Sequence, residues 1–135
     1  MIIDTSALLA FFNAREPMHK ATRDCVLASN EALVVSPFVM AELDYLVASR
    51  LGVHAELLVL GELSGGAWEL PEFTLGDLAR AASVVERYRD QQIGLADASN
   101  VVLADRYRTR TIATLDRRHF DLVRPLRGGR FRIVP

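Results

Sequence analysis

The stretches Met-Ile-Ile-Asp-Thr-Ser at residues 1–6 and Thr-Ile-Ala-Thr-Leu-Asp at residues 111–116 decide the expected fold. In each, a short run rich in apolar and β-branched residues is followed by an aspartate. Such short apolar runs are typical of buried parallel strands and are too short for stable helices. We therefore expect two strands of one parallel sheet, each with an aspartate after its carboxyl end.

Three further segments predict strands, namely residues 32–35, 68–70 and 131–134. Helical signals lie between the strands. Ser36-Pro37 predicts the start of an amphipathic helix that runs to Leu51, residues 53–63 predict a second apolar helix, and a helix-like run covers residues 19–29.

Two more helices are predicted further along the chain. Thr74 and Asp77 have the spacing of a capping box at the head of a helix that reaches about Gln92, and another helix starts at Asp97 and runs to about Tyr107. Parallel strands need helical crossovers, so alternation of strands and helices predicts an α/β fold with helices on both faces. We expect a three-layer α/β/α domain around a central parallel sheet of about five strands.

Length and composition indicate one compact domain over residues 1–135, because the chain has 135 residues of which 50% are hydrophobic. Cys25 is the only cysteine, which excludes a disulfide framework and a zinc site built on cysteines. The chain has no signal-peptide pattern and no apolar run near the roughly 18 residues of a membrane span. These features favour a cytoplasmic protein.

Charge is distributed unevenly, although the formal net charge is -1. Residues 1–105 carry 7 basic and 15 acidic groups, whereas residues 106–135 carry 9 arginines and only two acids, Asp116 and Asp121. The basic tail is either a solvated surface or a surface for phosphate or an acidic partner.

Four acidic residues are placed to form one site. Asp4 and Asp116 each follow a predicted strand, and ligands of α/β sheets bind outside the carboxyl ends of the strands. Glu42 in the first turns of one helix and Asp97 at the start of another face the same edge of the sheet. Each acid alone also has an ordinary explanation as a helix cap, a turn residue or a solvated charge.

The four acids together predict a metal site. Converging carboxylates repel by roughly 3 kcal/mol per pair at about 5 Å and an effective dielectric of about 20. The chain has a single lysine, Lys20, and no His/Cys ligand set, so a hard cation is the expected compensation. An all-oxygen shell selects Mg²⁺, with Mn²⁺ as a possible substitute, and such sites hydrolyse phosphodiesters. Thr5, Ser6 and Asn100 are candidate auxiliary groups, with helix capping as the alternative.

Four segments of this chain are similar to those of the PIN-domain ribonucleases, specifically the VapC toxins of type II toxin–antitoxin pairs of the mycobacterial type. The matching segments are Met-Ile-Ile-Asp-Thr-Ser (1–6), Ser-Pro-Phe-Val-Met-Ala-Glu-Leu (36–43), Leu-Ala-Asp-Ala-Ser (95–99) and Ile-Ala-Thr-Leu-Asp-Arg-Arg-His-Phe (112–120). The resemblance implies Asp4, Glu42, Asp97 and Asp116 as metal-site carboxylates, with Ser6 and Thr114 as auxiliary residues.

The resemblance also implies the substrate and partners. It implies an endoribonuclease that cleaves structured RNA, either transfer RNA or the sarcin–ricin loop of 23S ribosomal RNA, and so inhibits translation. It implies a homodimer and a VapB-type antitoxin that blocks the acidic site, often with an arginine. Residues 53–63 and 75–85 are candidate dimer or antitoxin surfaces, with core packing as the alternative.

The remaining basic residues have smaller expected roles. An RNA enzyme with an acidic site needs neighbouring basic surface, so we expect RNA contacts from arginines of the tail: Arg108, Arg110, Arg117 and Arg118. The three histidines lack metal-ligand spacing, and surface or packing roles are expected for them.

Two other functions remain open from the sequence. A receiver-like signalling domain has a similar length and an acidic Mg²⁺ pocket, but that pocket needs a lysine at a strand end, and Lys20 lies in an early helix. A domain that binds RNA or a partner without cutting is the second alternative, and the presence of all four carboxylates argues against it.

Overall fold

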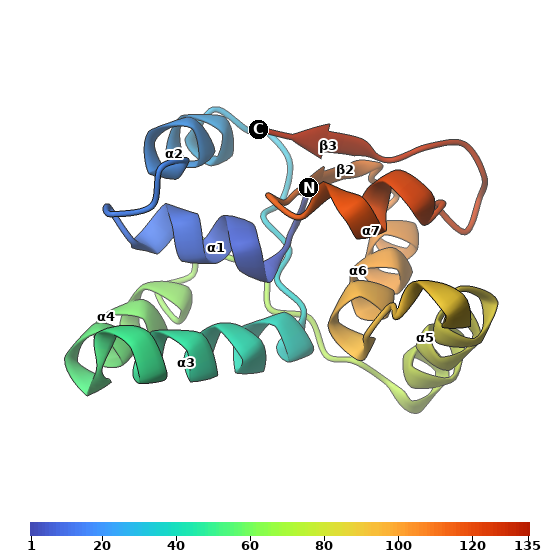
Figure 1. Ribbon diagram of the computed structural model, residues 1–135, viewed down its shortest axis with the longest axis horizontal. Helices are drawn as coiled ribbons and strands as arrows, with labels where there is room; N and C mark the ends of the chain where they lie inside the picture. The colour runs from blue at the N-terminus through green and yellow to red at the C-terminus, as the bar shows by residue number, and fades with distance from the viewer.

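The computed structural model describes residues 1–135 as a helical protein around a small sheet (Figure 1). In chain order the elements are β1 (Ile2–Ile3), α1 (Thr5–Phe12), α2 (His19–Leu27), α3 (Pro37–Leu51), α4 (Val53–Leu63), α5 (Leu75–Arg87), the 3-10 helix η1 (Arg89–Gln91), α6 (Leu95–Arg106), β2 (Thr111–Ala113), α7 (Arg117–Leu122) and β3 (Arg132–Val134). No helix among them has the length and apolar character to cross a membrane.

The sheet is parallel and has the strand order β1-β2-β3. Two of the five expected strands are reduced to single bridges, in which Val34 pairs with Ile2 and Glu69 pairs with Val34. Pairing cannot extend far there, because Ser36 already caps α3 and Pro71 lacks a backbone N–H. The expectation of a central parallel sheet is confirmed, with three regular strands and two bridging residues beside them.

Alternation along the strands separates two hydrophobic cores. Ile3, Val35 and Ala113 point into the core that α1 to α4 cover. Their neighbours Ile2, Val34 and Ile112 point into the core that α5, α6 and α7 cover. Figure 1 shows the two helical groups on the left and right of the molecule, which is the expected three-layer arrangement.

The ends of two helices differ from the expectation. The helix expected to reach Gln92 ends at Arg87, because η1 follows and Gln92 adopts a left-handed conformation with φ 54°. The helix expected to start at Asp97 begins at Leu95, with Gly94 as its N-cap. The short helix α7 was not predicted, since six residues are too few to show periodicity.

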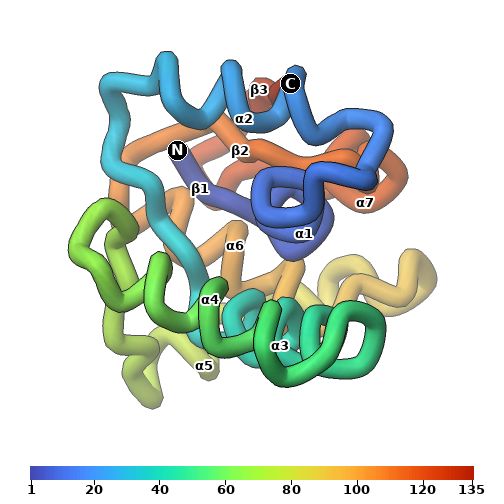
Figure 2. The backbone as a smooth tube through the Cα atoms, turned by 90° about the vertical axis from the view of Figure 1, so that its left-hand side faces the viewer, coloured from blue at the N-terminus to red at the C-terminus, as the bar shows by residue number.

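Parallel pairing brings the carboxyl ends of β1 and β2 to one edge of the sheet. Figure 2 shows the two strands side by side, running in the same direction into α1 and α7. The buried hydroxyl of Ser36, at the start of α3, hydrogen-bonds the hydroxyl of Ser99 in α6. This contact sets α3 beside the start of α6 at the same edge.

The capping box of α5 also links α5 to α6, so its loss tests how the two helices are held together. Asp77 accepts hydrogen bonds from Thr74 and pairs with Arg106 at 2.9 Å, with only 8% of its side chain exposed. Asp77→Ala should lower the unfolding free energy by about 1–3 kcal/mol, because the Thr74 and Arg106 donors lose their acceptor. The measurement is the thermal midpoint, with Asp24→Ala, an exposed ion-pair residue, as the matched control. Equal midpoints for the two variants would contradict this role.

Candidate functional site

The four acids expected to form one site do lie around one cleft. Asp4, Glu42, Asp97 and Asp116 all line a cleft of about 320 Å³ beyond the carboxyl ends of β1 and β2. They come from four different elements, as expected. The cleft is also lined by Ser6, Thr5, Leu9, Leu46, Arg50 and His119.

Asp4 is the most buried of the four acids, with 6% of its surface exposed. It stands at the N-cap position of α1, yet its side chain makes no capping hydrogen bond. Its carboxylate instead accepts hydrogen bonds from Ser6 (2.9 Å), Thr114 (2.8 Å) and the Asn100 amide (3.1 Å). Burial raises the pKa of Asp4, and the Thr114 and Ser6 hydrogen bonds only partly offset that rise.

The three expected auxiliary residues therefore lie around Asp4. Ser6 and Thr114 also hold the turn after β2, because they accept the backbone N–H groups of Leu115 and Asp116. Asn100 lies one turn after Asp97 on α6 and is fully buried, and its Oδ1 atom has no hydrogen-bond partner. These contacts fasten α1, β2 and α6 together under the cleft.

Asp97 is in the first turn of α6 and faces the cleft instead of capping the helix. Burial raises the pKa of Asp97, and the neighbouring charges of Asp4 and Glu42 raise it further. His119 lies 3.0 Å from the Asp97 carboxylate, measured from Nδ1 to Oδ2. Sequence reasoning gave this histidine a surface or packing role. Its position three residues after Asp116, on one face of a helix, was the signal that could have placed it in the cleft.

Glu42 lies on α3 and is the most exposed of the four acids. Its carboxylate accepts a hydrogen bond from the hydroxyl of Thr5, which follows Asp4 directly. Thr5 therefore joins Glu42 to the Asp4 side of the cleft. This bond orients the glutamate toward the other acids and away from solvent on the outer face of α3.

Asp116 caps α7 and turns toward the side chain of Arg118. Both carboxylate oxygens meet the guanidinium group, at 3.3 and 3.2 Å, and this contact lowers the pKa of Asp116. The ordinary explanation for Asp116 from the sequence was a turn residue, and the structure shows that it caps a helix and also lines the cleft. Arg117 follows it and donates a hydrogen bond to the Pro135 carbonyl (3.1 Å).

The expected RNA-binding arginines fall into two groups. Arg117 and Arg118 begin α7 at the edge of the acidic cleft. Arg108 and Arg110 precede β2 and line a different pocket, at the opposite end of the strand from Asp116. Only the first pair can therefore reach a phosphate held in the cleft.

The donor chemistry of the cleft fits a hard divalent cation. Its four acids offer only carboxylate oxygens, which are the ligands that hard divalent cations prefer. Burial, and then the charges of Asp4 and Glu42, raise the pKa of Asp97, so a cation in the cleft would be attracted to these acids. No group of three or more carboxylate, imidazole or thiol side chains is close enough in this arrangement to enclose a metal ion. The Asp116–Arg118 and Asp97–His119 contacts account for this spacing, so these acids must turn inward to share a cation.

Asp97→Asn should raise the thermal midpoint in metal-free buffer at neutral pH. The pKa of Asp97 is raised in the folded protein, so its charged form costs stability above that pKa. The advantage of asparagine should shrink as pH falls toward about 4, because the wild-type side chain then becomes protonated. The measurement is the midpoint of both proteins across pH, with Asp121→Asn as the exposed control. A lower midpoint for Asp97→Asn at neutral pH would contradict charge repulsion at this site.

Solved structures with this fold include toxins of toxin–antitoxin pairs. VapC20 of Mycobacterium tuberculosis, described as a sarcin–ricin loop cleaving toxin, aligns with a TM-score of 0.79 and 17% identity over 85% of this chain and 88% of that chain. A toxin–antitoxin complex from Klebsiella pneumoniae aligns with a TM-score of 0.73 and 16% identity over 99% of this chain and 95% of that chain. At this level of identity the likeness shows the shared fold.

Sequence comparison identifies the family. The PIN domain profile matches residues 1–124. Ribonuclease VapC26 of Mycobacterium tuberculosis (strain ATCC 25618 / H37Rv) is 64% identical over 135 residues, which cover 100% of both chains. A receiver-like signalling domain is thereby excluded. The chain that folds Asp4, Glu42, Asp97 and Asp116 around one cleft belongs to the PIN-domain family and, within it, to the VapC ribonucleases.

Proposed function

We propose that this protein is a Mg²⁺-dependent endoribonuclease, with Mn²⁺ as a possible substitute, whose catalytic groups are Asp4, Glu42, Asp97 and Asp116. The observation that carries the proposal is the convergence of these four carboxylates on one cleft. Family membership supplies the substrate class, because the full-length relative is a ribonuclease.

Each acid has a distinct part in the proposed mechanism. Asp4 and Asp97 are the principal metal ligands, because they are the two most enclosed and the charge of one raises the pKa of the other. Asp116 would join them as a ligand if it exchanged Arg118 for the ion, and Glu42, on the more exposed side, would hold the ion directly or through a water. A bound divalent ion lowers the pKa of water and stabilises charge on a phosphodiester.

Other side chains of the cleft position the acids and the RNA. Ser6, Thr114 and Asn100 hydrogen-bond Asp4 and so preserve its orientation. His119 holds Asp97. Arg50 lines the cleft, and Arg117 and Arg118 border it, so these guanidinium groups are placed to contact phosphates beside the scissile bond.

The expected substrate is a structured RNA, either transfer RNA or the sarcin–ricin loop of 23S ribosomal RNA, whose cleavage inhibits translation. The sarcin–ricin loop is the target named for VapC20, which shares the fold. Sequencing the new RNA ends that the protein produces from total RNA would distinguish transfer RNA from the sarcin–ricin loop as the substrate.

We also propose that a VapB-type antitoxin occupies an apolar groove beside the cleft. The groove has a volume of about 650 Å³ and lies between α1, α2, α3 and α4, with Phe11, Phe12, Leu51 and Leu58 among its walls. Leu58 is 63% exposed. Leu9 lines both the groove and the acidic cleft, so a peptide bound in the groove is led to the four acids.

The exposed α4 residues Val53 and Leu57 are candidates for contact with a second copy in a homodimer.

Cleavage should depend on metal and on Asp97. Purified protein, free of antitoxin, should cut total RNA with Mg²⁺ or Mn²⁺ and leave it intact with a chelator. Asp97→Asn should reduce the rate by at least about a hundredfold, because loss of a group that merely supports a metal ligand already costs about 10- to 100-fold, and Asp97 is proposed as a ligand itself. Asp121→Asn, on exposed α7, is the matched control and should cut normally. Intact RNA with either metal would favour a domain that binds RNA without cutting it.

Leu58→Asp should weaken the complex with the antitoxin while leaving RNA cleavage intact, because it puts a charge into the apolar groove. Loss of one well-packed apolar anchor costs about 1–3 kcal/mol, or roughly a 5- to 100-fold rise in Kd. The readout is inhibition of cleavage as antitoxin is titrated. Leu75→Asp, at an 87% exposed position in the other candidate surface, residues 75–85, is the comparison variant and should leave inhibition unchanged. If Leu75→Asp weakens inhibition and Leu58→Asp does not, the antitoxin does not bind in the groove.

A further inference from the structure

Two neighbouring pockets away from the acidic cleft are lined by arginines. One, of about 210 Å³, includes Arg108, Arg110 and Arg127, and the other, of about 230 Å³, includes Arg80, Arg87 and Arg124. Leu126 lines both, so the pockets share a wall. We call these six arginines the arginine surface. None of them lines the acidic cleft.

Asp105 joins the two pockets. Its carboxylate binds Arg80 of one pocket and Arg127 of the other, the latter at 2.6 Å from Nε. The hydrogen bond from Arg80 and the contact with Arg127 lower the pKa of Asp105, so it stays charged. A single carboxylate thus fixes the spacing of two guanidinium groups.

The other four arginines of the surface have no carboxylate partner, namely Arg87, Arg108, Arg110 and Arg124. Two of them lie against the backbone, Arg110 beside Gly129 and Arg124 hydrogen-bonded to a carbonyl. A Cβ atom at Gly129, where φ is +87°, would be 2.9 Å from Arg110 Nη1, so glycine there leaves room for the guanidinium group. The Arg124 guanidinium donates to the Asp121 carbonyl at 3.3 Å, and the Arg124 backbone N–H donates to the Tyr88 hydroxyl at 3.1 Å. Guanidinium groups that are positioned by the fold but have no carboxylate partner indicate a binding site for an anionic ligand.

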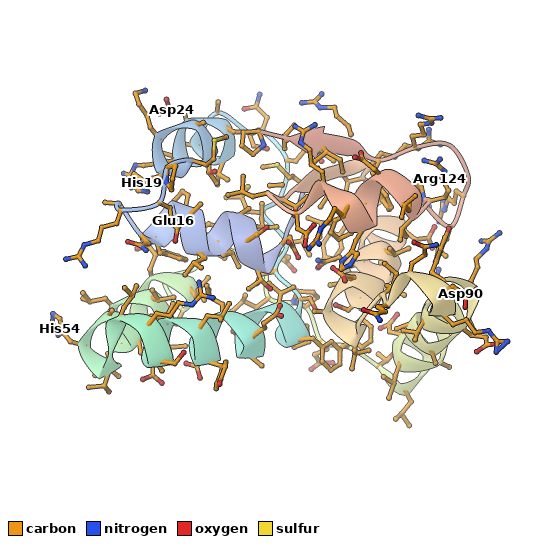
Figure 3. The ribbon with its side chains drawn as sticks, viewed as in Figure 1. Glu16, His19, Asp24, His54, Asp90 and Arg124 are labelled. Carbon is orange, nitrogen blue, oxygen red and sulfur yellow. The ribbon has the colours of Figure 1, made fainter.

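The surface is separated from the acidic cleft by the length of α6. Asp97 is near the start of α6 and Asp105 near its end, a separation of eight residues and a rise of about 12 Å. Figure 3 shows Arg124 at the end of the molecule opposite to Glu16, His19 and Asp24. A ligand that touches both sites must therefore be extended.

We propose that the arginine surface is a second RNA-binding site, which holds backbone phosphates of a structured RNA while a distant segment of that RNA enters the acidic cleft. This proposal rests on the proposed ribonuclease function. Planar guanidinium groups match phosphate oxygens, and double-stranded RNA is recognised mostly through its backbone and shape. A protein partner would need apolar anchors, and Leu126 is the only exposed leucine that lines these two pockets.

The test measures binding of purified transfer RNA to protein carrying Asp97→Asn, so that no cleavage occurs. Arg108→Glu with Arg124→Glu removes one unpaired arginine from each pocket. We expect Kd to rise at least about tenfold at about 0.1 M salt, and the slope of log K against log salt to fall by about 1.4–1.8, since each phosphate contact contributes about 0.7–0.9.

The matched control is Arg15→Glu with Lys20→Glu, which makes the same change in net charge at the other end of the molecule. It should change Kd by less than about threefold, because exposed charges further away than the ~8–10 Å Debye length are screened. Arg87→Gln with Arg110→Gln is a second test variant, and thermal midpoints establish that every variant is folded.

An unchanged Kd and salt slope in both folded test variants would overturn the arginine surface. Equal losses in the control would also overturn it, because they would reflect net charge alone. So would test variants that weaken antitoxin binding and not RNA binding. Cleavage of the same RNA by protein with Asp97 intact is measured in parallel, so failure of the ribonuclease proposal is read separately from failure of this one.

Discussion

The buried carboxylate of Asp4 is the constraint on which the site depends. A charge taken out of water must be satisfied by hydrogen bonds, and here the donors are neutral groups from three elements: Ser6 of α1, Thr114 after β2 and Asn100 of α6. Neutral donors stabilise the charge without cancelling it. The protein therefore keeps a negative potential in the cleft while using the same hydrogen bonds to lock α1, β2 and α6 together, so the fold and the chemistry share one network.

The position of the four acids could be predicted from sequence because it follows from topology. Asp4 and Asp116 come after parallel strands, and Glu42 lies near the start of α3, which follows the bridging residue Val34. Asp97 is at the start of α6, the helix that leads into β2, so its end near Asp97 lies at the edge where β2 finishes. The two cores were similarly readable, because successive residues of a strand face opposite sides. These predictions depend on backbone direction, which apolar patterns and caps specify over a few residues.

Other features depend on side-chain choices between segments that sequence periodicity does not relate. The Asp97–His119 contact requires α7 to lie beside α6, and α7 is too short to reveal itself. Likewise, the pattern of arginines predicted one basic tail, whereas β2 runs between the two pairs of arginines and places them at its opposite ends. Arg117 and Arg118 reach the cleft, and Arg108 and Arg110 are carried to the other end. Prediction from the sequence is limited here because long-range packing and side-chain rotamers depend on residues that are far apart in the chain.

Leu9 is a wall of both the apolar groove and the acidic cleft. A substitution of Leu9 that weakened binding of the proposed antitoxin would also disturb the surroundings of Asp4 and Glu42. Such a variant would therefore lose activity together with inhibition. Differences that let one toxin recognise its own antitoxin among many must therefore accumulate at the far end of the groove, around Leu58 and Leu51. With the antitoxin in the proposed groove, a substitution at the α4 end changes recognition alone, whereas a substitution of Leu9 also changes the surroundings of the four carboxylates.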